Sequence, residues 1–280
     1  MEPTLLLSES EISDKTLDPF TFETAKALFD SHGFLKIGNL FPREWIQTLA
    51  DTFLAKPACD PMKMALSCGA KDHGGRIISI PLAPPFNQSA LYANPILLPL
   101  MKAFLGSDCI LGGLSAVIAF PGGGEQPIHR DFEPLFNEQP FLTAVHAPFA
   151  IAVGIPLVDI DEVNGPTKIW SSTHRAVEFD KNKIDQKYER HLLCGPMGSC
   201  YFWDYRTYHA EGANRSKQLR PLLYLFYTRC WFRDLKNPDR MLPDAQEIPK
   251  EHSSLFLRSE SLHKAKEESK IQALFEEERK

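Results

Sequence analysis

The sequence predicts a mainly β fold with flanking α-helices, of the β-sandwich or jelly-roll type. Helical spacing of apolar residues is concentrated before residue 107, whereas short apolar runs separated by turn residues follow it. Residues 149–158 are nearly all apolar, which is typical of a strand buried on both faces. Many short strands preceded by helices indicate a sandwich or jelly roll with helical buttresses. The expected strands are residues 110–120, 149–158, 201–203 and 222–227, after a short extended piece at 34–38.

Three helices are expected before the strands, at residues 18–33, 42–57 and 94–106. Asp18-Pro19 and Asn94-Pro95 begin two of them, because Asp and Asn cap a helix and proline suits its first turn. A glycine follows the last turn of the same two helices and suits a helix end. The apolar residues of each helix share one face, so we expect all three to pack on the core.

The chain is expected to form one domain over residues 1–280. With 280 residues and a hydrophobic content of 43%, it can bury a large core. Within this domain we expect a helical buttress at about 18–106, a jelly-roll core at about 107–232 and a C-terminal extension at 233–280. Residues 264–280 are highly charged and suit a solvated tail helix, the alternative being a docking or oligomer helix.

Charge, hydropathy and cysteine pattern exclude several classes of protein. The formal net charge of −5 gives no reason to expect a nucleic-acid partner. No apolar run reaches the ~18 residues needed to cross a bilayer, and residues 1–18 lack the basic start of a secretion signal. The six cysteines are scattered without a Cys-x-x-Cys pair, which favours reduced thiols. We therefore expect a cytoplasmic protein without membrane contact, whose oligomeric state stays open.

His129 and Asp131 are candidate metal ligands. Side chains two residues apart lie on the same face of an extended segment. An imidazole nitrogen and a carboxylate oxygen suit a first-row metal such as Fe(II), and His209 offers the third ligand of a facial triad. A His-x-Asp pair taken alone is more often an ordinary surface pair, so the segments that accompany it decide its meaning.

Four further features accompany this triad: the turn at 164–167, residues 196–204, residues 208–216 and Arg220. With them, residues 33–227 resemble the phytanoyl-CoA dioxygenase superfamily of Fe(II)- and 2-oxoglutarate-dependent oxygenases, including its natural-product-tailoring branch. The resemblance implies a double-stranded β-helix, which is a distorted jelly roll of the cupin-like kind.

The resemblance also implies that His129, Asp131 and His209 bind Fe(II). Three protein ligands on one face leave three coordination positions, enough for bidentate 2-oxoglutarate and O2. Relatives that halogenate lack the carboxylate at the position of Asp131, so halogenation is disfavoured here. Arg130, between two of the ligands, is expected to point away from the metal.

The resemblance assigns 2-oxoglutarate binding to Arg220, Gln126 and Thr167. Arg220 matches the basic residue that pairs with the distal carboxylate, and a guanidinium offers a planar, permanently charged fork for it. Gln126 and Thr167 match positions that hydrogen-bond the same cosubstrate without adding charge. Considered singly, Arg220 would usually be a surface arginine and Thr167 an ordinary turn hydroxyl, whereas order and spacing together favour the oxygenase site.

Two departures from the family pattern lie outside these positions. Gly198-Ser199 stands where the family usually has Gly-Asp, and Ser-Ser-Thr-His at 171–174 stands where it has Pro-Gly-Ser-His. His174, like His146 and His191, is expected to have a structural role.

The implied activity is oxidation of a small organic molecule in specialised metabolism, with 2-oxoglutarate and O2 converted to succinate and CO2. Hydroxylation is the default outcome, and desaturation or oxidative cyclisation share the same oxidant. The alternative is a non-catalytic or cupin-like jelly-roll protein that binds a metal or ligand. Arg220, Thr167 and Gln126 discriminate between the two, because a simple metal binder needs no carboxylate anchor.

Residues 56–88 are expected to form a long loop that contains several prolines and glycines. Loops of this length in a compact domain are often lids or binding loops. The strand-like run at 76–80 argues against simple disorder, so we expect the loop to close over the cavity. Arg76 and Phe86 would then contact the substrate, Arg76 through a carboxylate. The alternative is a passive surface loop with a solvated Arg76.

Overall fold

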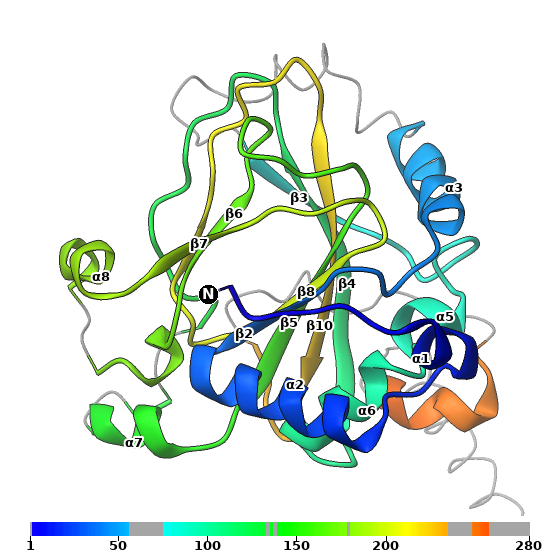
Figure 1. Ribbon diagram of the computed structural model, residues 1–280, viewed down its shortest axis with the longest axis horizontal. Coiled ribbons are helices and arrows are strands. Elements are labelled where there is room, and N and C mark those ends of the chain that lie inside the picture. The colour runs from blue at the N-terminus through cyan, green and yellow to red at the C-terminus, as the bar shows by residue number, and fades with distance from the viewer. Residues whose placement is uncertain are drawn as a thin grey trace, which may run out of the picture.

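Two β-sheets form the centre of the computed structural model (Figure 1), which describes residues 2–55, 75–132, 135–136, 139–177, 180–234 and 248–257. The larger sheet contains, in spatial order, β1 (Thr4–Leu5), β2 (Phe34–Ile37), β8 (Cys200–Asp204), β5 (Ala150–Pro156), β10 (Arg220–Thr228), β4 (Ile110–Ala119) and β3 (Gly75–Ser79). The smaller sheet contains β7 (Arg190–Leu193), β6 (Thr167–Trp170) and β9 (His209–Glu211). Apart from β1 with β2, these neighbouring strands pair antiparallel.

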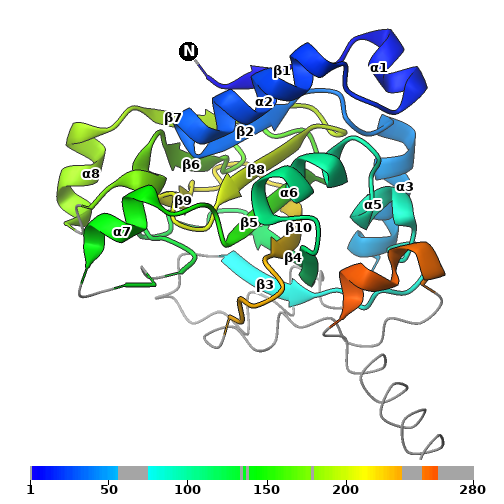
Figure 2. The same cartoon turned by 90° about the horizontal axis from the view of Figure 1, so that it is seen from below.

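Helices cover the larger sheet on the side away from the smaller one, as Figures 1 and 2 show for α2 and α6. Helix α8 lies instead beside the smaller sheet in both views. The described helices are α1 (Glu9–Asp14), α2 (Pro19–His32), α3 (Arg43–Leu54), α5 (Ser89–Tyr92), α6 (Leu97–Leu105), α7 (Pro140–Val145) and α8 (Lys181–Lys187), with the 3₁₀ helices η2 (Thr173–Arg175) and η4 (Lys250–Phe256).

Alternation along the strands of the larger sheet divides the core into two layers. On β10, Leu223 and Leu225 pack with the helices, whereas Tyr224 and Phe226 face the smaller sheet. All residues of β5 are buried because both of its faces are covered, as its apolar sequence predicts. The two facing sheets with helices outside confirm the predicted mainly β fold with flanking α-helices.

The helix boundaries follow the capping residues seen in the sequence. Asp18 accepts hydrogen bonds from the backbone N–H groups of Phe20 and Thr21 at the start of α2, and Gly33 ends that helix with a φ of 77°. Asn94 accepts hydrogen bonds from the first backbone N–H groups around α6 at 2.9 and 3.1 Å. Side-chain hydrogen bonds of Asp18 and Asn94 therefore set the entry to both predicted helices, and Gly33 sets the exit of the first.

The expected 56–88 loop is only partly within the described residues, which resume at β3. This strand pairs with β4 and extends the larger sheet. The residues after it turn into the core, where Ile80, Leu82 and Phe86 are buried. Residues 56–74 and 264–280 lie outside the described residues, so the expectations for them, and the division into buttress, core and extension, stay predictions.

Two simple findings concern the whole described chain. The search of the described residues for a helix of sufficient length and hydropathy to span a bilayer found none. The four cysteines in this part of the chain, which are Cys109, Cys194, Cys200 and Cys230, form no disulfide.

Candidate active site

His129 and His209 lie side by side between the two sheets. They form an isolated antiparallel bridge, and their ring centroids are 4.3 Å apart. Asp131 completes the group: its Oδ2 is 3.8 Å from His209 Nε2, and one potential ligand atom from each of the three residues lies within 4.8 Å of the others. The structure therefore brings together all three residues that the sequence predicts as metal ligands.

Backbone carbonyl groups orient the two imidazole rings. Nδ1 of His129 is 3.0 Å from the carbonyl oxygen of Pro127, and Nδ1 of His209 is 3.0 Å from that of Thr207. A carbonyl only accepts, so Nδ1 is the donor of this hydrogen bond in both rings. A histidine that binds a metal usually donates its other ring N–H to a carbonyl or carboxylate in this way.

Two side chains from the larger sheet hold the carboxylate of Asp131. Trp203 on β8 donates its indole N–H to Oδ2 at 3.2 Å, and the Tyr224 hydroxyl on β10 donates to the same oxygen at 2.9 Å. The two rings contact each other edge to face, with centroids 5.5 Å apart. Neither partner could be predicted from the sequence, because the register that aligns β8 and β10 beside Asp131 does not follow from spacing along the chain.

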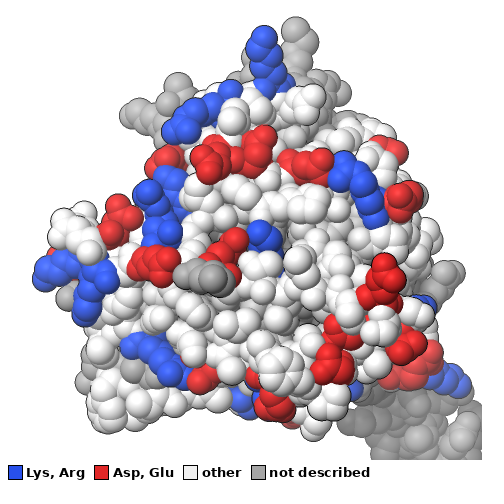
Figure 3. All heavy atoms as spheres, viewed as in Figure 1, with Lys and Arg blue, Asp and Glu red and all other residues white. Residues whose placement is uncertain are grey.

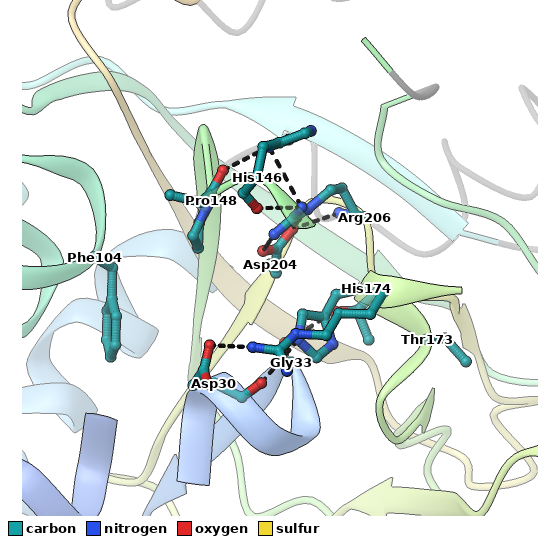
Figure 4. Close-up of polar contacts among 12 residues, drawn as sticks. Asp30, Gly33, Phe104, His146, Pro148, Thr173, His174, Asp204 and Arg206 are labelled. Atoms are coloured by element: carbon teal, nitrogen blue, oxygen red, sulfur yellow. Dashed lines mark hydrogen bonds and ion pairs between the residues drawn. The ribbon is translucent and has the colours of Figure 1, made fainter. Parts of the chain in front are cut away.

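The turn between β8 and β9 is stabilised by a buried ion pair (Figure 4). Arg206 donates to both carboxylate oxygens of Asp204, at 2.9 and 2.6 Å, and to the carbonyl oxygen of His146 at 2.8 Å. Burial by itself would raise the pKa of Asp204, but the adjacent guanidinium outweighs it and holds the pKa below its usual value. This turn leads directly to Thr207 and His209, so the ion pair fixes the position of a candidate metal ligand.

His174 and Arg130 have structural partners, as expected. The Nε2 of His174 lies 3.0 Å from the Asp30 carbonyl oxygen, and burial lowers the pKa of this histidine to about 4 (Figure 4). Arg130 donates to the carbonyl oxygens of Thr173 and Ala176 and lies over the Tyr208 ring. Neither residue lines the cavity that contains the triad.

One cavity of about 100 Å³ contains the triad together with the residues expected to bind 2-oxoglutarate. Gln126 lies where the segment before His129 meets β9: its backbone N–H donates to the Glu211 carbonyl oxygen at 2.9 Å, and its Oε1 accepts from the Glu211 N–H at 3.2 Å. Thr167 on β6 is opposite Glu211 in the register of β6 and β9. Arg220 starts β10 on the facing sheet.

Arg220 is the buried cation of this cavity. Its side chain is 1% exposed, and Nη2 forms an ion pair with Oε1 of Glu211. Burial lowers the pKa of Arg220, and the attraction of Glu211 opposes that shift, so the guanidinium stays charged. Nε and Nη1 have no hydrogen-bond partner within the described structure. Buried, unpartnered donors of this kind fit a carboxylate ligand.

Apolar side chains form the rest of the cavity wall. Val117 on β4 and Leu222 on β10 lie opposite each other in register, and Ile77 on β3 is the register partner of Val117. Ile77 is 50% exposed, so it lies where the cavity opens to solvent.

The two expected substrate contacts have different positions. Phe86 is buried in the core between the helices and the larger sheet and does not line the cavity, because the chain after β3 turns inward. Arg76 belongs to β3, opposite Ile118 in the register, but its side chain is outside the described structure. The contact of Arg76 with a substrate stays a prediction.

Acidic and basic side chains are intermixed over the face drawn in Figure 3. This agrees with the near balance of 31 Lys and Arg against 36 Asp and Glu in the chain. Inside the cavity, by contrast, the acidic and basic side chains are those of Asp131, Glu211 and Arg220.

A jelly roll with a His, Asp and His group beside a buried arginine defines the class of non-haem iron enzymes that use 2-oxoglutarate. Residues 29–222 match the sequence profile of the phytanoyl-CoA dioxygenase (PhyH) family, which is more than half of the chain. The chain therefore belongs to the phytanoyl-CoA dioxygenase family and is an iron- and 2-oxoglutarate-dependent enzyme of the oxygenase type. The resemblance noted in the sequence is confirmed.

Solved structures share the fold. The non-heme alpha ketoglutarate dependent epimerase SnoN from nogalamycin biosynthesis is 16% identical, with a TM-score of 0.56 over 76% of this chain and 84% of SnoN. SnoN in complex with Fe3+, alpha ketoglutarate and nogalamycin RO gives a TM-score of 0.55 at 16% identity, over 76% and 85% of the two chains. EvdMO1 is 21% identical, with a TM-score of 0.53 over 72% of this chain and 48% of EvdMO1. At these identities the likeness shows the double-stranded β-helix fold alone.

Proposed function

We propose that this enzyme oxidises a small organic molecule of specialised metabolism, with hydroxylation as the default outcome. In that reaction substrate, O2 and 2-oxoglutarate give hydroxylated product, succinate and CO2. Desaturation or oxidative ring closure would use the same site. The single observation that carries this proposal is the presence of the triad and Arg220 in one cavity.

We assign Fe(II) to His129, Asp131 and His209. Two imidazoles and a single carboxylate suit Fe(II) and leave positions for other ligands. The bound iron supplies the activation of O2. The chain contributes the orientation of its ligands, through the carbonyl groups behind both rings and through Trp203 and Tyr224 behind Asp131.

We assign the distal carboxylate of 2-oxoglutarate to Arg220, with Gln126 and Thr167 hydrogen-bonding other oxygens of the same molecule. The donors Nε and Nη1 of Arg220 support this assignment, since a buried cation gains most from an anionic partner. The side-chain oxygen Oε1 of Gln126 accepts from the β9 backbone, so its side-chain NH2 group is the part that would donate to 2-oxoglutarate.

The proposed substrate is a compact, largely apolar molecule that enters beside β3. Ile77, Val117 and Leu222 supply an apolar wall, and such a wall excludes water from the reacting atoms. Substrate contact by Arg76 through a carboxylate remains part of this proposal. SnoN belongs to nogalamycin biosynthesis, which is consistent with a role in specialised metabolism for this related fold. We place the enzyme in the cytoplasm, because the described cysteines form no disulfide.

Untargeted mass spectrometry of small-molecule extracts incubated with the enzyme tests this function. The reaction is run with Fe(II), 2-oxoglutarate and ¹⁸O-labelled O2, and the Asp131→Ala protein is the control. Hydroxylation predicts a product that gains one labelled oxygen and depends on 2-oxoglutarate. A product that only loses two hydrogens would identify desaturation or ring closure instead. Turnover that needs no 2-oxoglutarate would contradict the proposal.

A further inference from the structure

Glu211 is an acidic residue inside the proposed cosubstrate site. It follows His209 by two positions on β9, so both side chains point from the strand to the same face. Both residues line the cavity, and the Glu211 side chain is only 7% exposed. Neither the triad nor the cosubstrate positions require a carboxylate here.

The partner of Glu211 is the anchor itself. Its Oε1 is bound to Nη2 of Arg220, which the proposed function assigns to the distal carboxylate of 2-oxoglutarate. A guanidinium has two edges that offer a pair of parallel N–H groups, and Nη2 belongs to both of them. Nη2 has one N–H on each edge, so a carboxylate bound there occupies part of one edge and brings its charge next to any second carboxylate on the other edge.

The charges in the cavity lead to the same result. The carboxylates of Asp131 and Glu211 and the guanidinium of Arg220 all line it. An incoming 2-oxo dicarboxylate would place a second carboxylate beside Glu211 at one buried cation. Two carboxylates brought together in a buried site repel each other strongly. Removing the Glu211 carboxylate, or moving it away, would reduce this repulsion.

We propose that Glu211 is an internal competitor of the cosubstrate, whose carboxylate occupies Arg220 until the distal carboxylate of 2-oxoglutarate displaces it. This inference rests on the proposed function, because it takes Arg220 as the anchor. It makes Glu211 a residue that weakens cosubstrate binding and reduces the advantage of a dicarboxylate over a 2-oxo acid with a neutral tail.

The test measures the dissociation constants of two 2-oxo acids by anaerobic calorimetry with the Fe(II)-loaded protein. One ligand is 2-oxoglutarate, and the other is 2-oxopentanoate, which has the same chain length without the distal carboxylate. In Glu211→Gln we expect 2-oxoglutarate to bind about tenfold more tightly and 2-oxopentanoate to bind within about twofold of wild type. Glu125→Gln is the matched control, since Glu125 pairs with Lys168 at 2.5 Å and does not line the cavity; both affinities should stay unchanged there.

Unchanged or weaker 2-oxoglutarate binding in Glu211→Gln, or equal tightening of both acids, would overturn the inference. If that variant does not fold because Arg220 loses its counter-ion, Glu211→Asp keeps the charge and shortens its reach. In Glu211→Asp, the dissociation constant of 2-oxopentanoate divided by that of 2-oxoglutarate should rise severalfold. An unchanged ratio would again overturn the inference. Failure of the wild type to bind either acid would contradict the proposed function itself, which separates the two outcomes.

Discussion

His129 and His209 exchange two backbone hydrogen bonds, with N···O distances of 3.0 and 2.9 Å. This bridge joins the segment after β4 to β9, so the two candidate ligands are adjacent because of main-chain pairing. The main-chain bridge does not depend on the imidazole rings. Side-chain substitutions at these positions should therefore separate metal binding from folding.

Alanine at His129, Asp131 or His209 should abolish turnover and reduce bound iron to background while leaving the fold largely intact. The reason is that a facial triad with one ligand missing holds Fe(II) poorly, whereas the bridge and the core remain. Iron content and circular dichroism of each purified variant check this. Full activity of Asp131→Ala under ordinary iron supply would contradict the assignment.

Arg220→Ala should raise the apparent KM for 2-oxoglutarate far more than the KM for the organic substrate. Truncating one partner of a buried charge pair costs about 2–5 kcal/mol, which corresponds to roughly 30-fold or more in affinity. Arg43→Ala is a suitable control, because it breaks the half-exposed pair with Asp159 at 2.6 Å. A cosubstrate affinity within a factor of two of wild type in Arg220→Ala would mean that another residue is the anchor.

Tyr224→Phe should weaken iron binding about tenfold, because it removes the hydroxyl that holds Oδ2 of Asp131. Tyr227→Phe is the matched control on the same strand: its hydroxyl donates to the Tyr92 carbonyl oxygen at 2.7 Å on the helix side of β10. That control should lose about 1 kcal/mol of stability and keep its iron affinity. Equal iron affinities in the two variants would show that the Tyr224 contact has no role at the metal.

Stability should fall as the pH is lowered from 6.5 towards 4. The folded pKa of His174 is about 4, below its ordinary 6.5, so in this window the unfolded chain binds a proton that the folded chain does not. Between pH 6.5 and 5 the protonation of His174 in the unfolded chain should lower the free energy of unfolding by roughly 2 kcal/mol. Urea unfolding at several pH values compares wild type with His174→Gln, whose pH dependence in this window should be flatter. Parallel curves for the two proteins would rule out His174 as the titrating group.

The parts of the fold that local chemistry determines could be predicted from the sequence. Asp18 and Gly33 cap α2 where expected, Asn94 binds the turn that leads into α6, and the apolar run at 149–158 contains the buried strand β5. The short strands of the smaller sheet could not be predicted in the same way. On β7, exposed and half-buried residues alternate with buried ones over only four positions, Arg190–Leu193. This pattern is too short to distinguish a strand from a turn.

The candidate site shows the same division. The triad could be predicted because two ligands are two residues apart and the third lies in a segment that resembles the family pattern. Tyr224, Trp203 and Glu211 could not, because their roles depend on which strands are neighbours and in which register. Phe86, expected to contact the substrate, lies in the core instead. An apolar residue in a long loop can turn towards the core as well as towards a cavity, and the sequence does not distinguish the two.

The central claim is that Fe(II) and 2-oxoglutarate bind together at His129, Asp131 and His209. Anaerobic titration of the Fe(II)-loaded protein with 2-oxoglutarate, followed in the visible spectrum, tests it most directly. We expect a weak metal-to-ligand charge-transfer band that saturates with 2-oxoglutarate and is absent from the His209→Ala protein. A wild-type protein that binds iron but develops no such band, or a band that persists in His209→Ala, would contradict it.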